Sequence, residues 1–191
     1  MSLLLIGISG DEGRALVERL VAQSDEVRVI EDDPVDASEW TSLGAHVAHG
    51  SATDSDLIER AAQNVRTVVV MEERGRDLQA VIGAVLQGAP GAARREEDLR
   101  VVACAPDPAP TAELLSAAGV DHVVLGTGDR RGRLRIGGGG RIRAGALAEA
   151  IDAADDLAGN PRTSLDLTDP SAWEQLRLLP PDRPAEGRRQ R

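Results

Sequence analysis

The sequence predicts an α/β protein in which helices cover both faces of a doubly wound parallel sheet. Two observations predict this fold class. Short apolar runs alternate with longer segments that have the apolar period of a helix, as in repeated strand–helix units. The apolar residues are also almost entirely aliphatic, because the 191-residue chain has no Phe, no Tyr and only two Trp. An aliphatic core suits a parallel sheet that is buried on both faces.

The expected elements follow one another in a regular order. The apolar runs predict strands at 3–6, 27–30, 45–48, 67–71, 101–103 and 120–125. Helical periodicity predicts helices at 14–21, 38–43, 55–62, 77–87 and 111–118. Ser38 is a candidate N-cap of the second helix, Thr53 or Asp54 can cap the third, and Gly119 suits the end of the fifth. With right-handed crossovers, this order gives the doubly wound sheet.

The organisation changes after residue 126. Eight glycines lie in 126–145, where 134–136 and 141–143 form either a short hairpin or part of a flexible linker. An alanine-rich helix is expected at 144–157, followed by a short polar link and a final turn at 171–179. We therefore expect one α/β domain at 1–126 and a Gly/Arg-rich linker or hairpin plus helical extension at 127–179. Prolines and charges predict a disordered tail at 180–191.

Charge and composition exclude several classes of function. The net charge is −10, and residues 1–129 carry 10 Arg against 23 Asp and Glu, whereas 130–191 carry 12 Arg against 9 acids. An acidic main body argues against a nucleic-acid partner, which needs a basic face. The single Cys104 excludes an internal disulfide. No stretch approaches the roughly 20 apolar residues of a membrane span, and no signal peptide is evident, so we expect a cytoplasmic protein without membrane insertion.

A glycine loop follows the first strand and opens the first helix. Its glycines, Gly7, Gly10 and Gly13, have the spacing G-x-x-G-x-x-G. Glycines there let the backbone turn tightly and approach a pyrophosphate, and the start of the helix supplies unpaired N–H groups. The loop lies inside a strand–helix–strand unit, which is the context that such a fingerprint requires. It predicts a Rossmann-type domain over 1–126.

An acid at the end of the second strand supports this interpretation. Glu31 lies 18 residues after Gly13, where a carboxylate can accept hydrogen bonds from the adenosine ribose, and Asp32 is a neighbouring candidate. No Arg occurs at 31–34, which favours NAD(H) or an adenine nucleotide (ATP or ADP) over NADP(H). The alternative is a solvated strand end. Asp11 and Glu12 place negative charge in the loop itself and would repel phosphates if they faced the site.

These segments resemble the N-terminal nucleotide-binding domain of potassium-uptake regulators and channel gating rings, called TrkA-N or RCK. The resemblance covers about 2–125 and rests on the glycine loop, Val29-Ile-Glu-Asp-Asp-Pro34, the segment 44–57, and Ala112-Glu-Leu-Leu-Ser-Ala-Ala-Gly-Val-Asp-His-Val-Val124. It implies a cytoplasmic, usually dimeric domain that binds NAD(H) or adenine nucleotides and signals to a membrane transporter or channel subunit. It places the phosphates at the three glycines and the ribose at Glu31. Further cofactor contacts would come from Ser9, Asp32, Ser51 and Ala52.

The chain departs from that family at several positions. The family usually has an acid where Ser51 stands, a shorter glycine spacing, and an Arg after the fifth strand, where this chain has 104–105. Nothing after 126 resembles the regulators' C-terminal ligand domain. The glycine spacing and the segment 44–57 also resemble atypical short-chain dehydrogenases, including NmrA-like sensors. Catalytic members of that group need a Tyr and a Lys, which this chain lacks, so that mechanism is excluded.

No other residues form a convincing catalytic or metal site. His46 and His49 would face opposite sides of a strand, and Cys104 is either a small core residue or a redox-sensing thiol. An arginine cluster is either a flap over the nucleotide, a contact to the acidic body of a second subunit, or a mobile basic loop. It comprises Arg130, Arg131, Arg133, Arg135, Arg141 and Arg143.

Three hypotheses follow from the sequence. The first is a cytoplasmic, dimeric nucleotide sensor that resembles regulators of potassium transport. The second is a small NAD-dependent oxidoreductase or epimerase with an unidentified catalytic group. The third is a degenerate Rossmann domain that acts as an interaction module.

Overall fold

The computed structural model describes residues 2–23, 26–72, 75–92, 99–128, 135–136, 140–141, 144–157 and 161–178. The arginines at 130, 131, 133 and 143 and the expected tail at 180–191 lie outside these ranges. Within them, no helix combines the length and the apolar character needed to cross a bilayer.

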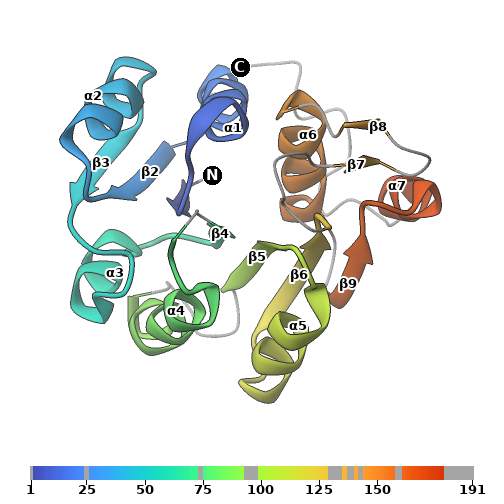
Figure 1. Ribbon diagram of the computed structural model, residues 1–191. Coiled ribbons are helices and arrows are strands. Elements are labelled where there is room, and N and C mark those ends of the chain that lie inside the picture. The colour runs from blue at the N-terminus through green and yellow to red at the C-terminus, as the bar shows by residue number, and fades with distance from the viewer. Residues whose placement is uncertain are drawn as a thin grey trace.

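A seven-stranded sheet forms the centre of the molecule (Figure 1). Its order is β3-β2-β1-β4-β5-β6-β9, and every neighbouring pair is parallel. The strands are β1 (Ser2–Ile6), β2 (Glu26–Glu31), β3 (His46–His49), β4 (Thr67–Met71), β5 (Arg100–Ala105), β6 (Asp121–Gly126) and β9 (Arg162–Asp166). The predicted doubly wound parallel sheet is confirmed.

Seven helices accompany the sheet in the described part of the chain. They are α1 (Gly10–Ala22), α2 (Pro34–Ser42), α3 (Ser55–Ala61), α4 (Leu78–Ala92), α5 (Pro108–Ala117), α6 (Ala144–Asp155) and α7 (Pro170–Leu178). The expected N-cap at Ser38 was wrong, because α2 begins four residues earlier, where Asp33 accepts from the N–H groups of Val35 and Asp36. Likewise, α5 begins at Pro108 behind the N-cap Asp107 rather than at Thr111. In both helices a proline occupies the first turn, where its missing N–H costs nothing.

The helices lie in two layers, one on each face of the sheet (Figure 1). Leu3 and Leu5 of β1 face one layer and belong to a buried cluster with residues of α1, α2, α6 and α7. Leu4 and Ile6 face the other layer and belong to a cluster with residues of α3, α4 and α5. This alternation along β1 is what a strand buried on both faces requires.

The segment after residue 126 is part of the same sheet and core. β9 pairs with β6 along His122–Gly126, so the expected polar link before residue 171 was wrong. Leu165 is the one buried residue of this edge strand, which is why the sequence of the strand looks polar. The hairpin alternative is confirmed in the described residues, where β7 (Arg135–Ile136) pairs antiparallel with β8 (Gly140–Arg141).

Candidate functional site

The candidate site lies at the carboxyl end of β1. From there the chain enters α1 on one face of the sheet, whereas the neighbouring β4 leads into α4 on the other face. In a doubly wound sheet, connections that leave in opposite directions open a crevice between them, and ligands bind there. The glycine loop, the residues that follow β2 and the residues that follow β4 all meet at this edge of the sheet.

The glycine loop has the backbone that its sequence predicts. Gly7 has φ 71° and Gly10 has φ 60°, a left-handed conformation that side chains with a Cβ rarely adopt. Gly13 instead permits a close approach, since a Cβ there would lie 3.1 Å from Ile8 Cβ and 3.2 Å from the Trp40 ring. All three glycines are therefore needed to set the loop and the start of α1 against the sheet.

The start of α1 offers main-chain donors at the crevice. The N-cap Ser9 is extended and makes no side-chain capping hydrogen bond, and the N–H of Gly13 donates to the Ser9 carbonyl over 3.2 Å. The N–H groups of the preceding residues have no acceptor within the helix and can bind an anion. The carboxylates of Asp11 and Glu12 stand in this first turn, where they offset part of its positive potential.

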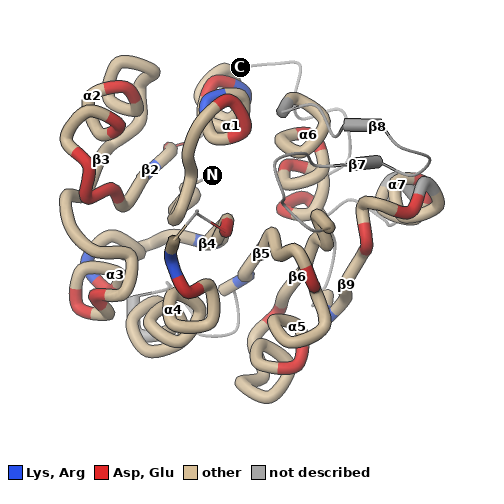
Figure 2. Tube along the Cα trace, in the orientation of Figure 1, with Lys and Arg blue, Asp and Glu red and all other residues tan. Residues whose placement is uncertain are grey.

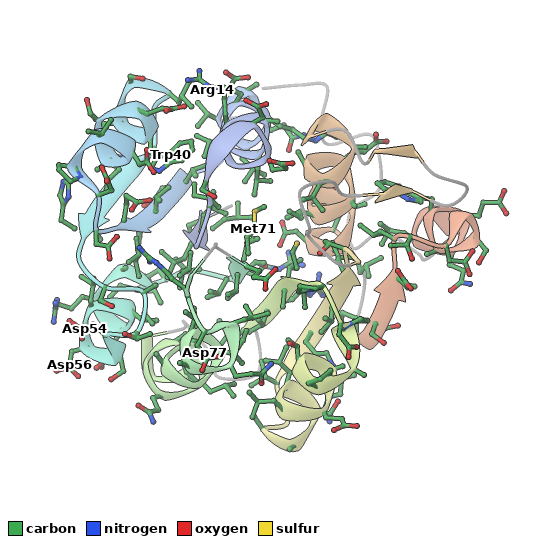
Figure 3. All side chains as sticks on the ribbon, in the orientation of Figure 1. Arg14, Trp40, Asp54, Asp56, Met71 and Asp77 are labelled. Atoms are coloured by element: carbon green, nitrogen blue, oxygen red, sulfur yellow. The ribbon has the colours of Figure 1, made fainter. Side chains whose placement is uncertain are left out.

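Glu31 is buried, and its carboxylate is already engaged. Only 4% of its surface is exposed, and Oε1 accepts from the main-chain N–H groups of Asp32 and Asp33 at 2.9 and 3.0 Å. Oε2 accepts from Trp40 Nε1 at 3.4 Å. Trp40 lies between α2 and α1 (Figure 3). Through these contacts the Glu31 side chain stabilises the turn between β2 and α2.

Asp32, directly after β2, is accessible at the end of the strand. Half of its side chain is exposed, and it forms an ion pair with Arg76, whose side chain is 23% exposed. Sequence reasoning missed Arg76, which lies 44 residues further along the chain. No local pattern marks this pair, because β4 and its following loop bring the two residues together.

The remaining predicted contacts lie after β3. Ser51 is exposed, and its hydroxyl lies 2.9 Å from Thr53 Oγ1 and accepts from the Thr53 N–H at 3.2 Å. Ala52 is 1% exposed and belongs to the core cluster on the α3 face. The Gly50 N–H donates to the Glu31 carbonyl at 3.1 Å, which ties this turn to the end of β2. Ser51 thus stays near the crevice, whereas the Ala52 side chain packs into the core.

Other candidate residues form no second site in the described ranges. No group of three or more His, Cys, Asp or Glu with the arrangement of a metal site occurs there. His46 and His49 are exposed at the two ends of the edge strand β3, and Cys104 is fully buried in β5. Arg135 and Arg141 of the arginine cluster occupy paired backbone positions of β7 and β8.

A family model described as the TrkA-N domain matches residues 3–126, which is more than half of the chain. Comparison with the sequences of curated proteins finds no match. Among solved structures, the triphenylmethane reductase of Citrobacter sp. complexed with NADP(H) has a TM-score of 0.68 at 13% identity, over 89% of this chain and 70% of that one. ChuY, an anaerobillin reductase from Escherichia coli O157:H7, has a TM-score of 0.64 at 16% identity, over 89% and 98%. Vestitone reductase from alfalfa has a TM-score of 0.60 at 11% identity, over 86% and 76%.

These reductases share the fold of the chain, at identities that show the fold alone. The family model covers β1 through β6, together with the glycine loop and the turns after β2 and β3. The family model confirms the TrkA-N resemblance stated from the sequence, and the solved structures share the fold that both resemblances imply. The chain belongs to the TrkA-N domain family and has a Rossmann-like α/β fold.

Proposed function

We propose that this protein is a cytoplasmic regulatory domain that binds NAD(H) or an adenine nucleotide at the carboxyl end of β1. The observation that carries the proposal is the glycine loop, in which Gly7 and Gly10 take left-handed backbone conformations directly before α1. This arrangement points main-chain N–H groups at the crevice, where a pyrophosphate is recognised without any lysine. Membership of the TrkA-N family supports the same ligand class.

A regulatory role fits the chain better than catalysis. The sequence has no Tyr, and all 22 of its basic residues are Arg, so the Tyr–Lys pair of short-chain dehydrogenases cannot operate. From the resemblance to the TrkA-N family, we also propose that the protein is a homodimer. It would signal to a transporter or channel subunit whether a nucleotide is bound. Acidic positions are spread over helices on both faces of the sheet, which does not suit a nucleic-acid partner (Figure 2).

A second candidate function is a nicotinamide-dependent reduction by residues other than Tyr and Lys. This second candidate is supported by the fold that the chain shares with three reductases, one of them complexed with NADP(H). Oxidation of NADH or NADPH in the presence of candidate carbonyl substrates would support this function. If this assay shows no turnover but the nucleotide binds saturably, the result would support the regulatory function.

Calorimetric titration of the purified chain with NADH, NAD, ATP, ADP and NADPH tests the proposal, and Gly10→Ala is the informative variant. A methyl group at Gly10 would stand where the loop approaches the pyrophosphate, so we expect binding to weaken by about tenfold or more. Gly119→Ala is a matched control. Gly119 also has a left-handed backbone (φ 74°, against 60° at Gly10), and no atom lies within 4 Å of an added Cβ.

The two variants separate backbone strain from ligand contact. Each should lose about 1 kcal/mol of folding stability, because each places a Cβ on a left-handed residue. Gly119 follows α5 on the opposite, amino edge of the sheet, so Gly119→Ala should bind as the unmodified chain does. If neither the unmodified chain nor its variants bind any of the five nucleotides, the proposed function is wrong and a Rossmann scaffold for protein contacts remains.

A further inference from the structure

One ion pair crosses the carboxyl end of β1. β1 pairs with β2 on one side and with β4 on the other, so residues that follow β2 and β4 stand on either side of it. Asp32 follows β2, Arg76 follows β4, and their side chains meet. Because adjacent strands lie about 4.8 Å apart, the two chain segments that this contact joins leave the sheet roughly two strand spacings apart.

We propose that Asp32 and Arg76 together determine how the protein discriminates a 2′-phosphate from a 2′-hydroxyl on the adenosine ribose. Arg76 receives the phosphate of NADP(H), and Asp32 accepts hydrogen bonds from the ribose hydroxyls of NAD(H). This inference rests on the proposed nucleotide site and adds to it the residues that select the ligand.

The burial of Glu31 assigns the ribose to Asp32. The Glu31 carboxylate is occupied by two main-chain N–H groups and the Trp40 indole, and it is almost completely buried. A ribose hydroxyl would have to reach a carboxylate that is almost closed off from the surface and already holds three donors. Asp32 is half-exposed at the same end of β2 and can accept a hydroxyl while one of its oxygens still contacts Arg76.

Arg76 changes the electrostatics of this position. A lone carboxylate beside the 2′ carbon repels a phosphate, which is how many NAD sites exclude NADP. Here the guanidinium touches that carboxylate, so it offsets the charge of Asp32 and places a planar donor for phosphate oxygens beside it. No Arg occurs at 31–34, but the folded chain brings Arg76 to this position from beyond β4.

The two side chains therefore act in opposite directions on selectivity. Without the Arg76 guanidinium, Asp32 repels the 2′-phosphate unopposed, and the ratio of the NADPH to the NADH dissociation constant should rise by about tenfold or more. Without the negative charge of Asp32, its repulsion of the 2′-phosphate disappears and the ribose loses an acceptor. The same ratio should then fall by a similar factor.

Titrations of NADH and NADPH into the unmodified chain, Arg76→Gln, Asp32→Asn and Arg60→Gln test this inference. Arg60 is exposed in the last turn of α3, so Arg60→Gln removes the same charge far from the crevice and should leave the ratio unchanged. Circular dichroism of each variant checks that it is folded. Opposite shifts of the ratio in Arg76→Gln and Asp32→Asn are the expected result.

Two outcomes would overturn the inference, and they can be told apart. If both nucleotides bind but the ratio stays within about twofold in Arg76→Gln and Asp32→Asn, this pair does not select the ligand and the proposed function stands. If the unmodified chain binds neither nucleotide nor ATP nor ADP, the nucleotide site itself is wrong and the inference falls with it.

Discussion

Asp155, the last residue of α6, is buried at the amino edge of the sheet, opposite the candidate site. Its carboxylate accepts a hydrogen bond from the Thr67 hydroxyl of β4. Arg100 of β5 donates to the main-chain carbonyls of Asp155 and Ala154, the latter over 3.3 Å. Burial raises the pKa of the Asp155 carboxyl, and the Thr67 hydrogen bond and the nearby arginine charges only partly oppose this. The protein therefore holds a carboxyl group that is easier to protonate when folded.

This shift makes folding stability depend on pH at one residue. Because the folded-state pKa of Asp155 lies above its unfolded value of about 3.9, its contribution is fully present below that pH and is lost as pH rises through the folded pKa. Asp155→Asn keeps an acceptor for Thr67 and cannot ionise. We expect its free energy of unfolding, relative to the unmodified chain, to increase as pH rises from about 4 and then to level off.

Urea denaturation at a series of pH values, followed by circular dichroism, measures this difference. Glu149→Gln is the control, because it removes a carboxylate from an exposed position of the same helix. A difference between Asp155→Asn and the unmodified chain that does not vary with pH would contradict the assigned cause of the shift.

Single residues also show where sequence reasoning reached its limit. The glycine loop could be predicted because left-handed backbone and close packing both demand glycine, whatever the ligand. The hydrogen bonds of Glu31 could not. An acid at a strand end looks the same in a sequence whether its carboxylate is open to solvent or already accepts main-chain N–H groups and the indole of Trp40.

At the scale of elements, α3 and α4 pack unusually closely. A Cβ at Gly88 of α4 would lie 2.3 Å from the Ser55 carbonyl oxygen and 3.0 Å from the Glu59 nitrogen. Both atoms belong to the backbone of α3, so the clash cannot be relieved by moving a side chain. Glycine at this position therefore sets the distance between the two helices.

Gly88→Ala should therefore destabilise the fold by about 1–3 kcal/mol, the usual cost of overpacking. Gly83→Ala is the matched control on α4, because nothing lies within 4 Å of its added Cβ. In a helix interior, that change should stabilise the protein by about 0.5–1 kcal/mol. Thermal unfolding of both variants gives the comparison, and equal effects would mean that α3 and α4 can move apart freely.

Element boundaries were predicted less well than element types. Pro34 and Pro108 look like helix breakers in a sequence, yet each opens a helix behind an aspartate N-cap. β9 was missed because an edge strand needs few buried residues, so its segment lacks the apolar run that marks β1 or β4. A strong period of apolar residues identifies the central helices and strands. Peripheral elements form through contacts with their neighbours and leave a weaker pattern in the sequence.

At the scale of the whole molecule, the core does not end where the family match ends. The TrkA-N match stops at residue 126, but α6, β9 and α7 contribute buried residues to the same cluster as α1. α6 is also fixed to α1 by Asp152, which accepts from Arg19 at 2.8 and 3.0 Å and from Gln23 at 3.2 Å. The sequence could not reveal this arrangement, since the contacts join residues more than 120 positions apart.

Removing residues 129–191 should therefore expose one face of the sheet. The lost apolar side chains include Leu147, Ile151, Leu157, Leu165 and Leu176, and each is worth about 1.5–3 kcal/mol when buried. We expect chain 1–128 to bind a hydrophobic dye and to lose cooperative thermal unfolding. Chain 1–178 should still unfold cooperatively. A fragment 1–128 as stable as the longer chain would show that the TrkA-N segment folds by itself.

The position of Trp40 makes its intrinsic fluorescence a probe of the candidate site. The chain has no Tyr, so its near-ultraviolet emission comes from Trp40 and Trp173 alone. The Trp40 ring borders Gly13, and its indole N–H is held by Glu31, so it sits directly behind the loop that a nucleotide would touch. Tryptophan emission overlaps the absorption of reduced nicotinamide. Quenching of this emission therefore offers a label-free readout of the crevice, and replacement of Trp173 would leave a single reporter there.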